Sequence, residues 1–411
     1  MDPADAIRIR YPSSEDLPAV YESQSHVYGI SVEPGDIEAW KRRVHLDDIL
    51  IAEDVADAEQ PFLVGTSLTY RMRVTVPGGA RLRAAGLAMI TVAPTHERNG
   101  IWQRLSAQGF NILMERGYPI LCGLPTHPRI YDELGGGVAS YGRTYSINRR
   151  VAKLRTAPSR NRAREVNASE AASHLPDLYE RWCAVTNGAL SRDAAWWEDF
   201  LEDRPTQRDN GSALNFVIHP DGFLTYRVMG EKRRAFRPPL GSVAVQDFCP
   251  ITDEAHTELL HALLRLEVFH TVEIEVPVDD PLPLKLVDQR AAQTTAVNDF
   301  LWLRIMNVPE VLGRRAYAAD ADVVLEVADP LGVAGGRFLL QTRDGVGTCA
   351  PHDGPADVEI GLADLGTIYM GAHRVPELQR ANRITEFRSG ALRSLEAALA
   401  VDRAPYCGTY F

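Results

Sequence analysis

Between residues 86 and 124, the order of apolar and polar positions predicts a strand, a loop, a helix and a second strand. An apolar run over 86–92 gives way to a polar loop over 93–100, and apolar residues then recur at helical spacing before a second apolar run over 118–124. The first four N–H groups of a helix have no partner inside it and lie at the positive end of its dipole. The helix start at Gly100 is therefore predicted to bind an anion such as a pyrophosphate, although an ordinary crossover loop has the same pattern.

The same kind of pattern over residues 1–150 predicts a mixed sheet with helices on its faces. Pro34 and Gly35 interrupt the periodicity, so residues 28–36 are expected to form a loop between two helices. A Pro-Gly-Gly turn within 75–80 separates two long strands. The predicted strands cover residues 7–10, 49–53, 62–72 and 85–92, and the first helix begins near residues 14–16.

Residues 151–290 repeat the ingredients of the first unit. A hairpin turns at 219–222, and a strand, a helix and a strand follow over 242–276. The junction between that strand and helix has no counterpart of the 93–100 loop. Residues 154–167 are rich in arginine and poor in apolar residues, and we expect them to form an exposed linker.

Residues 291–411 are predicted to form a third unit that mixes strands and helices. It opens with an amphipathic segment over 302–312. The expected strands cover 322–327, 336–342, 346–351 and 356–361, and the expected helices cover 363–370, 375–382 and 390–401.

The composition indicates a soluble globular protein and excludes several classes. With 45% hydrophobic and 24% charged residues, the 411-residue chain has an ordinary balance for two or three domains. Its net charge of −11 is opposite in sign to a nucleic-acid-binding surface, so no nucleic-acid partner is expected. No apolar run is long enough to span a membrane, and no signal peptide is visible. The five cysteines lie far apart without a CxxC pair, which favours a reducing cytoplasm and no metal site.

Motifs spread over the chain carry a family resemblance. They lie at residues 92–100, 130–131, 301–309 and 369–374 and at the terminal Phe411. Together they resemble the Eis (enhanced intracellular survival) family of GCN5-related N-acetyltransferases (GNAT). The resemblance implies an α/β fold with two GNAT-like mixed-sheet domains, 1–150 and 151–290, of which the second lacks a cofactor site. It also implies a sterol-carrier-protein-like α+β domain over 291–411 whose C-terminus reaches the active site, and assembly as a hexamer.

The resemblance further implies that acetyl-CoA is the acetyl donor. The backbone donors of Ile90 and Val92 are expected to hold the pantetheine as an added strand and to polarise the thioester oxygen. His96 and Arg98 add positive charge beside the predicted anion site. The expected cofactor contacts are Ile90, Thr91, Val92, Glu97, Arg98, Asn99, Gly100, Ile101, Trp102 and Thr126.

Two residues of this loop depart from the family's usual pattern. Glu97 stands where Arg or Gln is usual, and Trp102 stands where Gly or Ala is usual. A carboxylate repels a pyrophosphate and an indole is bulky, so weaker acetyl-CoA binding is expected.

Acetyl transfer to an amine needs a proton donor and a proton acceptor. The resemblance implies that Tyr131 is the general acid, because a phenol with a pKa near ~10 can protonate a leaving thiolate with a pKa near ~8.5. No glutamate or histidine base is visible near the motif. The resemblance implies that the C-terminal carboxylate of Phe411 is the base, which requires the chain end to dock in the cleft of the first domain. Without the resemblance, the simplest interpretation of Tyr131 is a ring packed after a strand, and the simplest interpretation of Phe411 is part of a disordered tail.

The expected acceptor is a primary amine of a small molecule or a peptide. Relatives that modify aminoglycosides carry acidic residues at the positions of Tyr28 and Tyr410, so aminoglycosides are expected to be poor acceptors here. Trp40 is expected either to line the acceptor pocket or to belong to the core. A second class of function also fits the sequence, namely a non-catalytic protein that binds an apolar ligand and has a degenerate acetyl-CoA loop.

Overall fold

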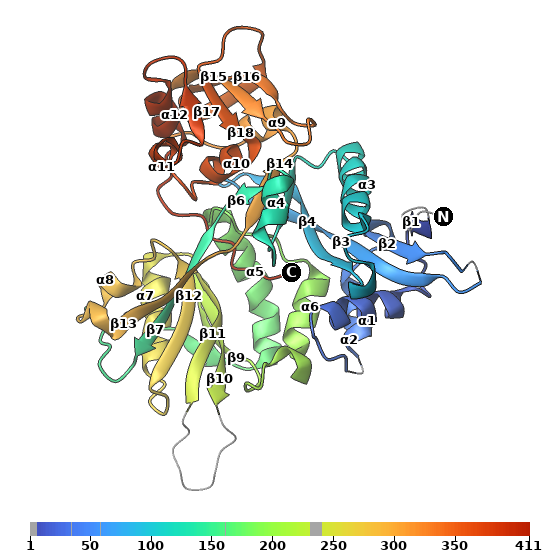
Figure 1. The fold of residues 1–411 in the computed structure, drawn as a ribbon. Coiled ribbons are helices and arrows are strands. Elements are labelled where there is room, and N and C mark those ends of the chain that lie inside the picture. The colour runs from blue at the N-terminus through green and yellow to red at the C-terminus, as the bar shows by residue number, and fades with distance from the viewer. Residues whose placement is uncertain (1–5, 34, 58, 161, 231–240) are drawn as a thin grey trace.

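The protein folds around three sheets that form three lobes, and its C-terminus lies where the lobes meet (Figure 1). The computed structural model describes residues 6–33, 35–57, 59–160, 162–230 and 241–411. The described strands form two sheets of seven strands and one of five. This arrangement confirms the predicted α/β class.

The first sheet holds most of the N-terminal unit. Its elements are β1 (Ile7–Arg10), α1 (Leu17–Val27), α2 (Asp36–Arg43), β2 (Ile49–Asp54), β3 (Phe62–Thr75), β4 (Arg81–Val92), the 3-10 helix η3 (Pro94–His96), α3 (Ile101–Glu115), β5 (Ile120–Gly123), α4 (Pro128–Glu133), β6 (Gly137–Val138) and β14 (Trp302–Ile305). The strand order is β1, β2, β3, β4, β5, β14, β6, and only the neighbours β4 and β5, which α3 connects, run parallel. Side chains alternate along β2, so that Leu50 and Ala52 pack under α3 while Ile49 and Ile51 pack under α1 and α2.

The second sheet repeats this plan. Its elements are β7 (Tyr141–Asn148), β8 (Arg164–Val166), α5 (Ala168–Val185), α6 (Ala194–Glu202), β9 (Asn215–His219), β10 (Gly222–Gly230), β11 (Gly241–Pro250), α7 (Asp253–Leu264), β12 (Thr271–Pro277), α8 (Leu282–Lys285) and β13 (Ala292–Asp299). Their order is β13, β7, β12, β11, β10, β9, β8. The prediction of a linker over 154–167 is wrong in its last part, because β8 pairs with β9 as an edge strand. An arginine-rich segment can occupy that place because an edge strand leaves its charged side chains in solvent.

The first two units exchange strands. β7 follows the first unit in the chain but lies in the second sheet, between β12 and β13. β14 follows the second unit but lies in the first sheet, between β5 and β6. The expectation of an amphipathic segment over 302–312 is therefore wrong for its first part: β14 is a central strand, and both of its faces are buried. The two sheets consequently do not divide at residues 150 and 290.

The third unit agrees with the predicted order of strands and helices, apart from one short extra strand, β19. Its elements are α9 (Val308–Leu312), β15 (Ala321–Ala328), β16 (Gly336–Arg343), β17 (Val346–Pro351), β18 (Val358–Gly361), α10 (Leu362–Met370), α11 (Val375–Arg380), β19 (Ile384–Glu386) and α12 (Ala391–Leu399). One continuous apolar core joins this unit to the first sheet. Among the described residues, no helix is long and apolar enough to cross a membrane.

Candidate active site

The central feature of the first sheet is a gap where β4 and β5 separate. The two strands pair only from Ala84 opposite Ile120 to Leu87 opposite Gly123, although β4 continues to Val92 along β3. A bulge at Met89, with a φ of 50°, lies in the unpaired part. Beyond the last pair, one edge of β4 is free of β5.

The backbone of Val92 faces this gap. The N–H of the next residue, Ala93, donates to the Val64 carbonyl of β3 at 2.8 Å. Because successive N–H groups of a strand point to opposite edges, the Val92 N–H points away from β3. It is therefore available to an extended ligand that lies in the gap.

The start of α3 closes one end of the gap. Gly100 precedes α3 with a φ of 71°, a left-handed conformation that favours glycine, and no side chain caps the helix. Glu97, Arg98 and Asn99 of the preceding loop are exposed. In the second unit, by contrast, the Thr252 side chain accepts a hydrogen bond from the Ala255 N–H and caps α7. The helix start predicted at Gly100 is thus present, and no side chain caps it.

Several predicted cofactor residues can offer only their backbone to a ligand. Ile101 is buried in the core between α3 and the sheet, and the Trp102 ring packs against an apolar cluster beneath α3. The Thr91 hydroxyl bonds to Thr66 at 2.8 Å. The His96 ring bonds through Nε2 to Asp54 of β2 at 3.1 Å. Arg98 of this loop is exposed, and Thr126 lies exposed in the loop before α4.

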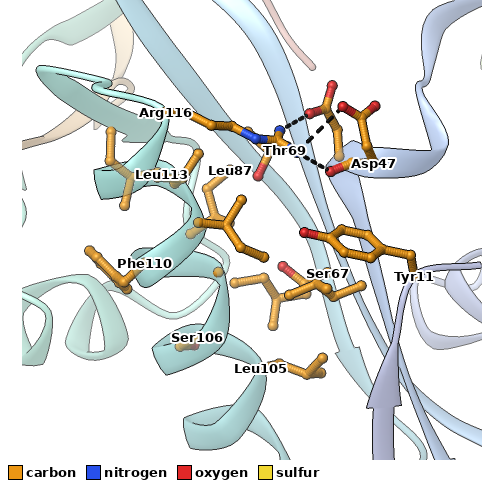
Figure 2. Close-up of a pocket in the computed structure, with 16 residues that line it drawn as sticks. Tyr11, Asp47, Ser67, Thr69, Leu87, Leu105, Ser106, Phe110, Leu113 and Arg116 are labelled. Carbon is orange, nitrogen blue, oxygen red and sulfur yellow. Dashed lines mark hydrogen bonds and ion pairs between the residues drawn. The ribbon is translucent and has the colours of Figure 1, made fainter.

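A separate pocket lies between α3 and the face of the sheet beneath it (Figure 2). Leu87 and Ile90 line its floor together with apolar residues of α3. Arg116 crosses its mouth and pairs with Asp48 at 2.5 Å. Ile90, one of the predicted cofactor contacts, is thus part of the lining of this pocket.

Tyr131, on α4, reaches the point where the two strands part. Its ring and hydroxyl occupy the space that a side chain at Gly123 would fill, and its hydroxyl lies 3.5 Å from the Leu87 carbonyl. That distance is too long for a strong hydrogen bond, so the proton remains available to a ligand. Burial, and then the nearby Cys122 and Tyr28, raise the pKa of Tyr131 above its ordinary value. The phenol is therefore neutral and keeps its proton.

Phe411 lies against the same two strands from the opposite face. A Cβ built on Gly86 would lie 2.9 Å from the Phe411 ring, and this ring also contacts Tyr70 edge to face at a centroid distance of 6.2 Å. Gly86 and Gly123 face opposite sides of the sheet, because Gly86 pairs with Cys122, the neighbour of Gly123. Tyr131 and the chain end thus approach one gap from its two sides.

The remaining predicted site residues lie around this end of the sheet. Tyr28 follows α1, is 39% exposed and acts electrostatically on Tyr131. Tyr410 is 67% exposed, with its ring 4.7 Å from that of Phe300. Trp40 is buried in the core between the helices and the sheet, which agrees with the second of its two interpretations.

Two residues beside Phe411 were missed by the sequence reasoning. Tyr70 belongs to β3 and contacts the Phe411 ring, and the Arg43 guanidinium lies 5.2 Å above the Tyr70 ring. Arg43 also pairs with Asp199 of the second unit at 3.0 Å. The alternation of Tyr70 with Leu68 and Met72 could have predicted its inward direction, whereas the partner of Arg43 is distant in sequence.

Family models match three successive parts of the chain. Two describe an acetyltransferase (GNAT) domain, over residues 8–139 and 188–305, and the third describes a sterol carrier protein domain over 308–408. The chain is accordingly an N-acetyltransferase of the GNAT superfamily, which confirms the predicted class of enzyme.

Comparison with individual proteins shows to which family within this superfamily the chain belongs. N-acetyltransferase Eis of Mycobacterium tuberculosis (strain ATCC 25177 / H37Ra) is 33% identical over 95% of this chain and 96% of its own length. An uncharacterised N-acetyltransferase of Streptomyces griseus is 31% identical over 85% of this chain and 86% of its own. The crystal structure of Eis1 from Mycobacterium abscessus superposes with a TM-score of 0.85 at 28% identity, covering 98% of this chain and 100% of that one. The chain belongs to the Eis family of N-acetyltransferases.

Proposed function

We propose that the protein transfers an acetyl group from acetyl-CoA to the primary amine of a small molecule or a peptide. The observation that carries this proposal is the free edge of β4 beside the uncapped start of α3. Such an edge can hold the extended pantetheine through main-chain hydrogen bonds, and the helix start can hold the pyrophosphate. We assign the cofactor contacts to the backbone of Ile90, Val92 and 97–102, with Arg98 as the cation.

In the proposed reaction, two groups of this chain move protons. Bound acetyl-CoA supplies the acetyl group as a thioester. A free carboxylate on Phe411 takes a proton from the acceptor ammonium, directly or through one water molecule, so that the amine nitrogen can attack the thioester carbon. As the C–N bond forms and the C–S bond breaks, Tyr131 gives its proton to the leaving sulfur. The second proton of the amine nitrogen then passes through water to the Tyr131 phenolate, which restores the phenol and leaves a neutral amide. The transfer is direct, and the buried Cys122 has a raised pKa that disfavours its thiolate as an acyl carrier.

We further propose that the acceptor carries its amine on an apolar body. Apolar side chains are exposed at the end of α1 and in the loop that follows, where Val27, Tyr28, Ile30 and Val32 are 39–48% exposed, and Tyr410 is also exposed. Polycationic acceptors need carboxylates that replace the water around their ammonium groups. A comparison of acceptors by released CoA tests this proposal. Kanamycin is expected to turn over at least tenfold more slowly than a monoamine with an apolar body, and equal rates would contradict the proposal.

The acetyl-CoA site can be tested with two glycine variants of α3. Gly100→Asp adds a carboxylate at the predicted anion site, whereas Gly117→Asp adds one at the other end of the helix. Both glycines have positive φ values, 71° and 63°, and both have open space around a built Cβ, so the local strain is matched. Calorimetric titration with acetyl-CoA is expected to give at least tenfold weaker binding for Gly100→Asp only. Equal affinities would place the cofactor elsewhere, and absence of binding to the parent would favour a non-catalytic apolar-ligand-binding function.

We also propose that the protein works as a hexamer in a reducing cytoplasm. The proposal rests on the family and on the five cysteines, which are all free thiols. Light scattering of the purified protein tests the assembly, and a monomeric mass would contradict it.

A further inference from the structure

The last residues of the chain run through the second unit before they reach the first sheet. The Tyr406 N–H donates to the Asn187 carbonyl at 2.8 Å, and its ring stacks on Phe300 at a centroid distance of 6.1 Å. Cys407 and Thr409 are completely buried. This segment is therefore held tightly, unlike an ordinary chain terminus.

Three polar side chains of the second unit hold this segment. The Arg192 guanidinium donates from Nε to the Thr409 hydroxyl at 3.1 Å and from Nη2 to the Gly408 carbonyl at 2.9 Å. Asp247 of β11 accepts from Nη2 at 2.7 Å, and both side chains of this ion pair are 2% exposed. The Tyr179 hydroxyl, on α5, lies 2.6 Å from the Thr409 hydroxyl. We call Tyr179, Arg192 and Asp247 the tail clamp.

The donors and acceptors of the tail clamp form one consistent chain of hydrogen bonds. Tyr179 donates to the Leu190 carbonyl at 2.7 Å, so Thr409 donates to Tyr179 and accepts from Arg192. The Arg192 guanidinium also lies 3.9 Å from the centroid of the Trp196 ring. Because these groups are buried, loss of the Thr409 hydroxyl leaves the Arg192 Nε–H without its partner.

The tail clamp is fixed relative to the catalytic sheet. Just before Arg192, the backbone pairs with the end of β3: Thr75 N–H donates to Ala189 O at 2.9 Å, and Ser191 N–H donates to Arg73 O at 2.9 Å. Asp247 comes from the middle of the second sheet. A change in the position of the clamp would therefore need a change in the contact between the two sheets.

We infer that the second GNAT domain, which has no cofactor loop, serves the reaction by fixing the position of Phe411 through the tail clamp. Thr409 lies two residues before Phe411, so a displacement of this anchor moves the Phe411 carboxylate directly. Proton transfer requires heavy atoms within roughly 2.6–3.2 Å, or one intervening water molecule. Arg192 is thus a positioning residue, and this role rests on the proposed function of Phe411 as the base.

Two readouts on the same variants test the inference. Thr409→Val removes the hydroxyl and keeps the volume, Thr409→Ser keeps the hydroxyl, and Arg192→Lys keeps the charge but loses the fork of donors. Thr342→Val is the control, since Thr342 is also buried, donates to a backbone carbonyl and lies in the third unit. The first readout is the rate at which carboxypeptidase releases Phe411, followed by mass spectrometry. The second is kcat and the KM for acetyl-CoA.

We expect Thr409→Val and Arg192→Lys to lose Phe411 at least tenfold faster than the parent and to fall at least tenfold in kcat with an unchanged KM for acetyl-CoA. Thr409→Ser and Thr342→Val should resemble the parent in both readouts. Release of Phe411 at the parent rate from folded Thr409→Val and Arg192→Lys would overturn the inference. Fast release with full turnover would support the anchor and would instead overturn the assignment of Phe411 as the base.

Discussion

The position of Tyr131 depends on the missing side chain of Gly123. The Tyr131 hydroxyl occupies the site of a Cβ at residue 123, and this brings the phenol to the last pair of β4 and β5. Gly109, in the middle of α3, has open space around its Cβ position and serves as a matched glycine that is remote from the gap.

Alanine at Gly123 should therefore lower turnover, whereas alanine at Gly109 should leave turnover unchanged and stabilise the fold. Gly123→Ala should displace the Tyr131 ring and lower turnover at least a hundredfold, as loss of acid catalysis typically costs ~10²–10⁴ in rate. Gly109→Ala should keep full turnover and raise the free energy of unfolding by roughly 0.5–1 kcal/mol, because alanine is the better helix former. Steady-state kinetics and urea unfolding measure both effects. Full turnover of Gly123→Ala would show that Tyr131 is not needed at this point.

Removal of the phenolic proton is the second test at the scale of one residue. Tyr131→Phe keeps the ring and its contact with Trp302, whose centroid is 6.2 Å away. We expect kcat to fall by ~10²–10⁴ while the affinity for acetyl-CoA stays within about twofold. Calorimetry and single-turnover assays check the two parts. Turnover within about twofold of the parent would refute the general-acid role.

At the scale of elements, β14 connects α4, which carries Tyr131, to the third unit. Arg304 of β14 donates to the Leu134 carbonyl at the end of α4 and to Asp329 at 2.9 Å, and both side chains of the ion pair are buried. Burial opposes ionisation of Asp329, but hydrogen bonds from Arg304 and the Ala334 N–H outweigh it and lower its pKa to about 2. The position of α4 is thus coupled to a buried ion pair.

This ion pair should make stability depend on pH at the acidic end. The unfolded pKa of an aspartate is about 3.9, so the stabilisation by the charged form is complete above that value and is lost as pH falls through about 2. Asp329→Asn cannot ionise. The parent's advantage over it should therefore shrink between pH 4 and pH 2, by roughly 2 kcal/mol in total. Urea unfolding at pH 7, 4 and 3 measures the difference, and a constant difference would contradict the assignment.

At the scale of the whole molecule, three distant parts of the chain contribute to the proposed site. The first unit contributes the gap and Tyr131, the second contributes the tail clamp, and the end of the third contributes Phe411. We therefore expect each unit to be needed for turnover, although the uncapped helix start at Gly100 lies in the first.

Extending the chain by one residue should test whether the Phe411 carboxylate is the base. A glycine after Phe411 moves the carboxylate by about 3.3–3.6 Å, which exceeds the tolerance of proton transfer. We expect turnover to be abolished while the melting temperature changes by at most a few degrees. An N-terminal tag should be harmless because β1 is an edge strand of the first sheet. Assays of the untagged, N-tagged, extended and Phe411-deleted proteins make the comparison, and full activity after extension would place the base elsewhere.

The sequence by itself determined the features that depend on neighbouring residues. The apolar runs predicted β4, β5 and the strands of the third unit, and the glycine before an apolar period predicted the start of α3. These predictions succeed because periodicity and capping act within a few residues of the chain.

The tertiary structure alone decided the strand exchange, the partner of His96 and the tail clamp. Any strand offers the same N–H and C=O groups at its edges, so nothing local in 302–305 specifies that β14 pairs with β5. Arg192 and Thr409 are 217 residues apart. Their contact depends on how the two sheets pack, and no residue pattern near either position predicts it. The helix start at Gly100 could thus be predicted from the sequence, whereas the residues that hold the chain end could not.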